Sequence, residues 1–91
     1  MRIKKLVLDI LIPRELHIVE LSLAIAGVNG VEEVKTTVQE VDERTSTLKV
    51  EVSGNGINYE EIYNTISHHG ASLRSVDEVI VVSGKSGFRE G

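Results

Sequence analysis

The sequence predicts a ferredoxin-like α+β sandwich, in which a four-stranded antiparallel sheet of order 4-1-3-2 carries two helices on one face. Apolar and polar residues alternate along four segments, as they do in strands that bury one side. Two other segments place their apolar residues at helical spacing. The six segments follow one another as strand, helix, strand, strand, helix, strand, which is the order of this fold.

The first strand is expected over residues 3–12, "IKKLVLDILI", and Pro13 ends it. One side of this strand is apolar throughout: Leu6, Leu8, Ile10 and Ile12. The other side carries Lys5, Val7, Asp9 and Leu11. A carboxylate avoids the inside of a sheet unless it has a partner, so Asp9 is the residue of this strand that needs an explanation.

The first helix is expected over residues 15–26 and is closed by Gly27, and "NG" at 29–30 signals a turn. Two strands are expected next, over residues 31–42 and 46–54. The short segment "DERT" lies between them and is typical of a hairpin loop.

The second helix has the clearest local signature. Asn58 is a capping residue, and Glu61 follows three positions later, as in a capping box. A stripe at helical spacing marks the side expected to be buried: Tyr59, Ile62, Tyr63 and Ile66. Gly70 closes the helix, and the last strand is expected over residues 73–84.

The length of 91 residues allows one small domain. We expect this domain over residues 1–85 and a mobile tail over residues 86–91. The sequence has no repeat and no linker.

The composition narrows the class of function. A net charge of −4, with only two tyrosines, one phenylalanine and no tryptophan, argues against binding to phosphate backbones or to stacked bases. The absence of cysteine removes disulfides, thiolate metal sites and cysteine nucleophiles together. No apolar run is long enough to cross a membrane. We therefore expect a cytoplasmic protein that binds neither nucleic acid nor membranes.

Two surfaces of the expected fold carry more apolar residues than a monomer needs. The sheet face without helices holds Val7 and Leu11, and Val79 and Val81 join them if Asp77 shares their parity. The first helix has two apolar stripes, although one is enough to cover the sheet. The first stripe comprises Leu16, Val19, Leu23 and Ala26, and the second comprises Ile18, Leu21 and Ile25. These surfaces predict a homo-oligomer.

Acidic residues form the main candidate site. The expected strand order puts Asp9 and Asp77 side by side on neighbouring strands, and Glu78 follows Asp77. Glu40, Asp42 and Glu43 form a second acidic group at the hairpin. Two interpretations are open: these carboxylates hold a calcium or magnesium ion, within one subunit or between subunits, or they are structural and pair with donors such as Arg74 and Ser75. No spacing in the sequence matches a known calcium loop.

Other candidate sites are weaker. His68 and His69 are adjacent on the second helix, so they point in different directions and suit a solvated helix end better than a shared metal. The segments "GNG" and "SGKSG" lack the spacing of a phosphate-binding loop. No order of serine, histidine and aspartate indicates a nucleophile, and nothing supplies a pocket for an acid–base pair. We expect no catalytic activity.

Three segments together resemble the archaeal domain-of-unknown-function family 211: "RIKKLVLDILIP", "GVEEVKTTVQEVDERT" and "SLRSVDEVIVVSGK". The resemblance runs from about residue 2 to residue 85. It implies a ferredoxin-like fold, homo-oligomeric assembly and no established activity. It also implies a shared acidic feature, with carboxylates matching Asp9, Glu40, Asp42, Asp77 and Glu78.

The sequence departs from the family at two places. Relatives have a Lys-Pro-His-Glu-Pro-like segment after the first strand, where this chain has "IPRELH". Relatives often have a histidine where this chain has Arg74. An arginine there can neutralise a nearby carboxylate, which favours the structural interpretation.

The observations together predict a non-enzymatic homo-oligomer that serves as a small-ligand-binding or regulatory module. The alternative is a divalent-metal protein, and its ligands for Ca²⁺ or Mg²⁺ would be drawn from Asp9, Asp77, Glu78, Glu40 and Asp42. No other cofactor is expected.

Overall fold

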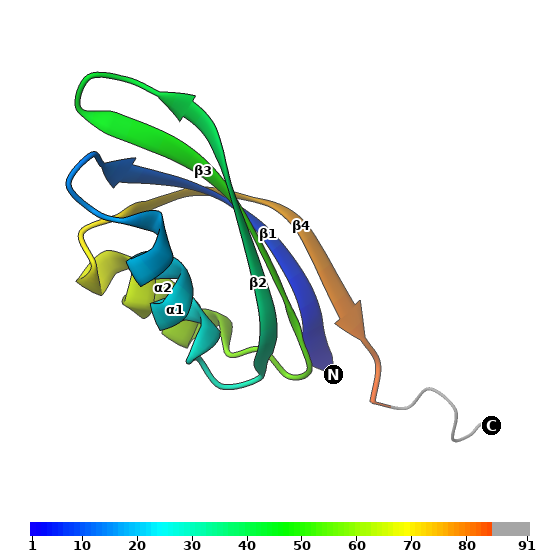
Figure 1. Cartoon of the computed structure of the whole chain (residues 1–91). Coiled ribbons are helices and arrows are strands. Elements are labelled where there is room, and N and C mark those ends of the chain that lie inside the picture. Colours follow the sequence, from blue (N-terminus) through cyan, green and yellow to red (C-terminus); the bar gives the residue numbers. More distant parts are fainter. Residues whose placement is uncertain (85–91) are drawn as a thin grey trace.

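The computed structural model describes residues 1–84 and confirms the predicted fold (Figure 1). Its elements, in chain order, are β1 (Arg2–Pro13), α1 (Ile18–Ala26), β2 (Val31–Val41), β3 (Thr45–Gly54), α2 (Tyr59–His68) and β4 (Ser72–Val82). The expected tail over residues 86–91 lies outside the described residues. Neither helix within residues 1–84 has the length and apolar character that a membrane span requires.

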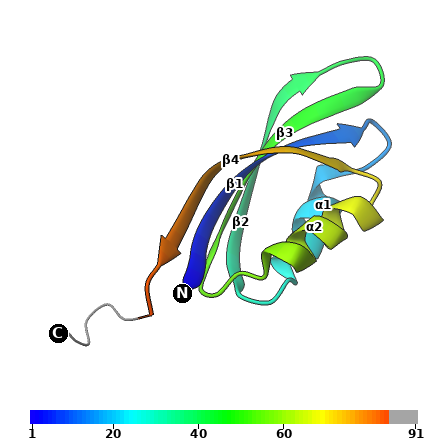
Figure 2. The same ribbon diagram turned by 180° about the vertical axis from the view of Figure 1, so that it is seen from behind.

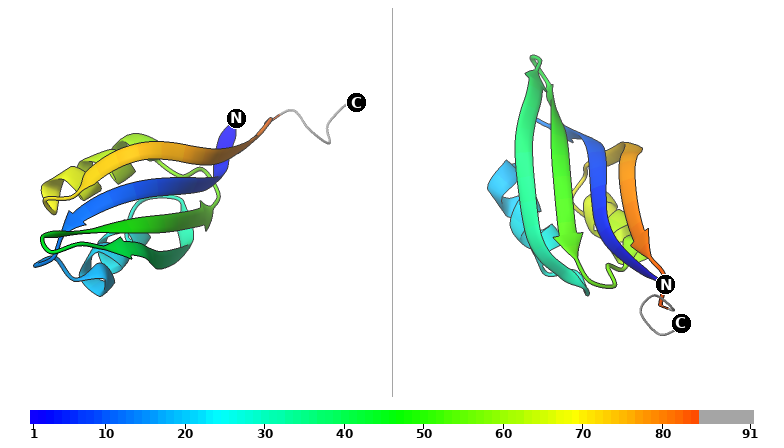
Figure 3. Two further views of the ribbon diagram at one scale, coloured as in Figure 1. Left: turned by 90° about the horizontal axis from the view of Figure 1, so that it is seen from above. Right: turned by 90° about the vertical axis from the view of Figure 1, so that its right-hand side faces the viewer.

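The four strands form one antiparallel sheet in the order β2-β3-β1-β4, and both helices lie on the same face of it (Figure 3). β1 is therefore a central strand, with β3 on one side and β4 on the other. The two edges of the sheet are β2 and β4. This placement puts Asp9 in the middle of the sheet, where neighbouring strands flank it on both sides.

The core lies between the helices and the sheet. The residues of β1 predicted to face the helices are all at most 2% exposed: Leu6, Leu8, Ile10 and Ile12. They are joined by Leu48, Val50 and Val52 from β3, by Leu21 and Ile25 from α1, and by Ile62 and Ile66 from α2. Strand alternation in β1 and β3 therefore identified their buried sides correctly.

The helix α1 begins three residues later than predicted. Residues 14–17 form a turn instead, in which the Leu16 amide donates to the Pro13 carbonyl at 3.1 Å. His17 occupies the cap position in an extended conformation, and its side chain makes no capping hydrogen bond. Along α1, the Ser22 hydroxyl contacts the Thr36 hydroxyl of β2 at 2.7 Å, which links the helix to the edge of the sheet.

The helix α2 begins where the capping signature predicts. The Glu61 amide donates to Asn58 Oδ1 at 3.0 Å, which satisfies one of the free amides of the first turn. After the helix, the chain turns at Gly70, whose φ of 78° suits glycine. The predicted apolar stripe is divided, because Ile62 and Ile66 are buried whereas Tyr59 and Tyr63 are 37% and 49% exposed.

Replacing Asn58 by alanine is expected to lower the free energy of unfolding by about 1 kcal/mol, because the cap of α2 is lost. Urea unfolding followed by circular dichroism measures this change. Asn64→Ala is the matched control, since Asn64 is exposed within the same helix. The control is expected to be neutral or slightly stabilising, because alanine has the higher helix propensity. An equal loss in both variants would contradict the capping role.

Candidate functional site

The sheet face that carries no helix, called here the open face, displays Asp9 as predicted. The strand pairing places Lys49 of β3 on one side of Asp9 and Ser75 of β4 on the other. On the far side of Lys49, Thr37 of β2 completes a polar row across all four strands. Asp9 is half-buried in this row, with Lys49 and Ser75 as its neighbours on the adjacent strands.

The prediction that Asp77 lies directly beside Asp9 is wrong, because β4 contains irregularities that the sequence does not announce. The pairing steps from Val7↔Glu78 to Leu8↔Val76, which leaves Asp77 as an extra residue in a bulge. A second step leaves Arg74 unpaired between Ser75 and Leu73. Asp77 is nevertheless tied to the Asp9 row, because Ser75 Oγ donates to Asp77 Oδ1 at 2.8 Å.

The same bulge changes the side on which two valines lie. Val79 pairs with Leu6 and Val81 pairs with Ile3, and both partners belong to the side that packs against the helices. The expectation that Val79 and Val81 lie on the open face is therefore wrong. The open face under β1 and β4 is more polar than predicted.

A shallow hollow of about 310 Å³ lies on the open face around Asp9. Its polar lining comes from all four strands and comprises Asp9, Gln39, Glu40, Thr47, Lys49 and Asp77. Three carboxylates and one ammonium group thus surround the same space. Such a lining favours a ligand with a positively charged group, while Lys49 provides a site for a negative charge or a hydroxyl.

A chain of ion pairs, called here the ion-pair ladder, crosses the open face next to the hollow. Lys5 Nζ lies 3.8 Å from Glu51 Oε1 and 3.6 Å from Glu78 Oε2, and Lys35 Nζ lies 3.9 Å from Glu51 Oε2. Val7 is flanked by Glu51 and Glu78 in the pairing and is only 6% exposed. Exposed ion pairs contribute little stability on their own, so we assign the ladder the role of covering Val7.

The structure separates the five acidic residues of the predicted metal site. Asp9, Glu40 and Asp77 line the hollow, whereas Glu78 belongs to the ion-pair ladder. Asp42 lies beyond β2 in the hairpin, where its carbonyl accepts from Arg14 Nη1 at 2.7 Å. Within residues 1–84, no three histidine, aspartate or glutamate side chains are grouped closely enough to hold a metal ion.

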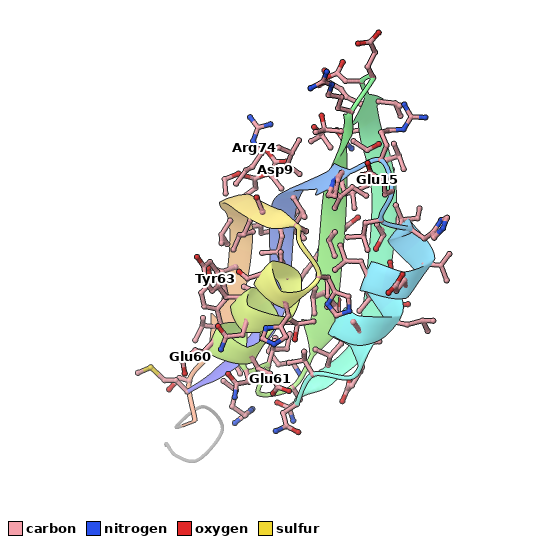
Figure 4. All side chains as sticks on the ribbon, turned by 90° about the vertical axis from the view of Figure 1, so that its left-hand side faces the viewer. Asp9, Glu15, Glu60, Glu61, Tyr63 and Arg74 are labelled. Carbon is pink, nitrogen blue, oxygen red and sulfur yellow. The ribbon has the colours of Figure 1, made fainter. Side chains whose placement is uncertain are left out.

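Of the other candidate residues, Arg74 lies near the hollow and the histidines do not. Figure 4 shows Arg74 near Asp9, at the start of β4, in line with the pairing of Asp9 with Ser75, the residue next to Arg74. The histidines lie elsewhere: His17 precedes α1, and His68 and His69 end α2, where His69 Nδ1 contacts the Thr65 carbonyl at 2.8 Å. The prediction of a solvated helix end is confirmed for His68, which is exposed, whereas His69 is half-buried.

Two features of the open face escaped the sequence interpretation. The ion-pair ladder was not predicted, although Lys5, Glu51 and Glu78 become neighbours as soon as β1 is paired with β3 and β4. Gln39 enters the lining of the hollow because it is the extra residue of a bulge between Val38↔Leu48 and Glu40↔Thr47. The ion-pair ladder could have been predicted by looking for opposite charges on neighbouring strands, whereas nothing in the sequence indicates the bulge at Gln39.

An apolar surface on α1 remains exposed, in line with the two predicted stripes. Leu21 and Ile25 are buried against the sheet, whereas Val19 and Leu23 are 66% and 69% exposed. This surface borders β2, where Val34 and Thr36 line a second hollow beside the helix. The exposed stripe exceeds what a helix of a monomer usually presents to water.

A four-stranded antiparallel sheet with both helices on one face and an acidic hollow on the other defines a ferredoxin-like α+β protein with a candidate binding face. The chain belongs to the DUF211 family, described as "Uncharacterized ArCR", whose pattern matches residues 4–86. It is 36% identical, over 78 residues, to the uncharacterized protein MJ0319 of Methanocaldococcus jannaschii. The matched region covers 86% of this chain and 80% of that protein.

Proposed function

We propose that the protein is a non-enzymatic, homo-oligomeric module that binds a small ligand in the hollow of the open face. The observation that carries this proposal is the convergence of Asp9, Glu40 and Asp77 with Lys49 on one space of about 310 Å³. That volume is at the lower end of the range for small-molecule sites. A ligand of the size of an amino acid, with an amine that meets the carboxylates, fits this lining best.

The assembly part of the proposal is supported by the apolar residues that the fold leaves exposed. The α1 stripe around Val19 and Leu23 lies at one edge of the molecule, and Val79 and Val81 lie at the other. Contiguous apolar surfaces of this kind are typical of interfaces. Symmetric association of identical copies is the usual way in which they are covered.

The absence of catalytic activity is supported by the chemistry of the lining. Thr47 is the only hydroxyl side chain that lines the hollow among the described residues, and no histidine is near enough to activate it. Acid–base catalysis would need an enclosed site around its two carboxylates, whereas Asp9 and Asp77 both line a wide, open hollow.

A divalent cation, Ca²⁺ or Mg²⁺, is the second candidate ligand. Asp9, Glu40 and Asp77 supply oxygen ligands of the kind that such ions prefer. Because no such group is close enough within residues 1–84 to hold a metal ion, the ion would need further oxygens from a second copy or from water. Metal binding would then be coupled to assembly.

Native mass spectrometry of the purified protein, with and without a chelator, tests both candidates. An oligomer with bound mass that the chelator leaves in place supports the small ligand, whereas bound mass that it removes supports the cation. Asp9→Asn and Asp77→Asn are expected to reduce the bound fraction at least about tenfold, since each loses a charge-assisted contact. Glu32→Gln on β2 is the matched control, because Glu32 is exposed outside the hollow.

Two results would overturn the proposal. Unchanged bound mass in both the Asp9 and the Asp77 variants would remove the hollow as the site. A monomer at all concentrations would remove the assembly.

A further inference from the structure

The second half of β4, residues 78–82 with the sequence "EVIVV", is an edge of the sheet without the usual protection. Among residues 1–84, β4 pairs only with β1, so no strand of this part of the chain pairs with its outer amides and carbonyls. The two extra residues of β4, Asp77 and Arg74, lie in its first half. The third irregularity of this pairing lies opposite Ile80 and Val81, but its extra residue is Lys4 of β1, so residues 78–82 of β4 contain no extra residue. Val79, Ile80 and Val81 are 52%, 43% and 51% exposed. A regular, apolar, exposed edge of this kind readily pairs with another strand.

The opposite edge of the sheet is protected in the ways that edge strands usually are. The strand β2 carries Glu33, Lys35 and Glu40, and it has bulges at Glu32 and Gln39. Charges and bulges on an edge strand disfavour pairing with another chain. The two edges therefore differ, and the second half of β4 is the one open to strand addition.

An apolar shelf continues this edge on the helix side. Val79 and Val81 face that side through their pairing with Leu6 and Ile3. Tyr63 lies on the flank of α2 next to β4 (Figure 4), and Tyr59 is one helical turn away on the same flank. Figure 2 shows that the end of β4 extends past α2, which explains why no helix or strand of residues 1–84 covers this shelf.

We propose that residues 78–82 of β4 pair antiparallel with the same residues of a second copy, around a two-fold axis at Ile80. This inference rests on the homo-oligomeric part of the proposed function and names its interface. The pairing of the two β4 strands would form one continuous sheet across both copies. On the helix side, Val79 of each copy lies opposite Val81 of the other, and the flanking tyrosines close the sides of this apolar cluster.

The segment is complementary to itself in this register. Of the antiparallel registers, the one centred on Ile80 is the one that pairs residues 78–82 over their whole length. It sets Glu78 opposite Val82, so no two like charges face each other across the axis. Glu78 also keeps its ion pair with Lys5 of its own chain. A two-fold interface must be self-complementary in this sense.

Val79→Lys and Val81→Lys test the interface through the oligomeric state, measured by light scattering or sedimentation over a range of concentrations. In a two-fold interface each substitution places one ammonium group from each copy among apolar side chains. The dissociation constant of the dimer is therefore expected to rise at least about 100-fold. Val41→Lys, at an exposed position of β2, is the matched control and is expected to leave this interface intact. Circular dichroism checks that each variant is folded.

A cross-linking experiment tests the register without charging the interface. The chain has no cysteine, so Ile80→Cys introduces a single thiol, which the axis places opposite its own copy. We expect nearly complete formation of covalent dimers under mild oxidation or with a short bismaleimide. Val38→Cys on β2 is the control, since Val38 is as exposed as Ile80.

The outcomes separate this inference from the function on which it rests. An oligomer that survives both lysine substitutions and gives no Ile80→Cys dimer overturns the β4 interface and leaves homo-oligomeric assembly standing. A wild-type protein that is monomeric overturns both the β4 interface and homo-oligomeric assembly. The apolar shelf would then be covered by another segment of the chain or by a different protein.

Discussion

Gly30→Ala is expected to lower the free energy of unfolding by at least about 3 kcal/mol, because two penalties act at one position. Gly30 has a φ of 89°, which is strained for any residue with a Cβ. An added Cβ would also overlap the Gly56 carbonyl and the Ile57 amide nitrogen, which are backbone atoms. Urea unfolding measures the loss.

The surrounding backbone has little freedom to move away from such a Cβ. The amides of Gly56 and Ile57 both donate to the Ile3 carbonyl at 3.1 Å, and the Asn55 amide donates to the Gly30 carbonyl at 2.8 Å. A shift of this loop would therefore break hydrogen bonds that hold the start of β1. The clash should accordingly appear as lost stability.

Gly56→Ala is the control that separates the two penalties. Gly56 also has a positive φ, of 72°, but an added Cβ there would meet nothing within 4 Å. The expected loss is about 1–2 kcal/mol, from the backbone conformation alone. The difference between the two variants measures the overlap, and equal losses would contradict the close approach at Gly30.

Leu8→Ala is expected to lower the free energy of unfolding by about 2–5 kcal/mol, through lost burial and the cavity left behind. Leu8 is 0% exposed on the central strand and lies between Val50 of β3 and Val76 of β4. Buried residues from both helices and from β1 and β3 form the core around Leu8, so the site has little room to collapse. Urea unfolding with an unchanged slope would confirm that the loss is one of stability.

Leu23→Ala makes the same chemical change on the exposed stripe of α1. Leu23 is 69% exposed, so its removal is expected to change stability by no more than about 0.5 kcal/mol. The comparison is made at low protein concentration, where association does not contribute to apparent stability. Equal losses in the two variants would contradict the placement of Leu8 in the core and Leu23 at the surface.

Most of the secondary structure could be predicted because its signals are local. The alternation in β1 and β3 identified the buried side of each strand correctly, and the capping pair of Asn58 and Glu61 located the start of α2. The start of α1 was less predictable. His17 provides no capping hydrogen bond, and the turn before it is set by the Leu16 amide and the Pro13 carbonyl.

The candidate site could be predicted only in part. Asp9 lies on the open face as its parity requires, and Asp77 lines the same hollow. Their direct pairing failed because each bulge in β4 shifts the register by one residue, which turns every later side chain to the other face. For this reason Ser75, and not Asp77, lies opposite Asp9, and Val79 faces the helices.

The sequence by itself determined the order of the elements, the buried side of β1 and the surplus of apolar residues on α1, because each depends on periodicity within one segment. The tertiary structure decided which charges meet and which edge stays open. The ion-pair ladder, the lining of the hollow and the exposed end of β4 depend on the register between strands and on the reach of α2. Both are set by contacts between residues far apart in the chain.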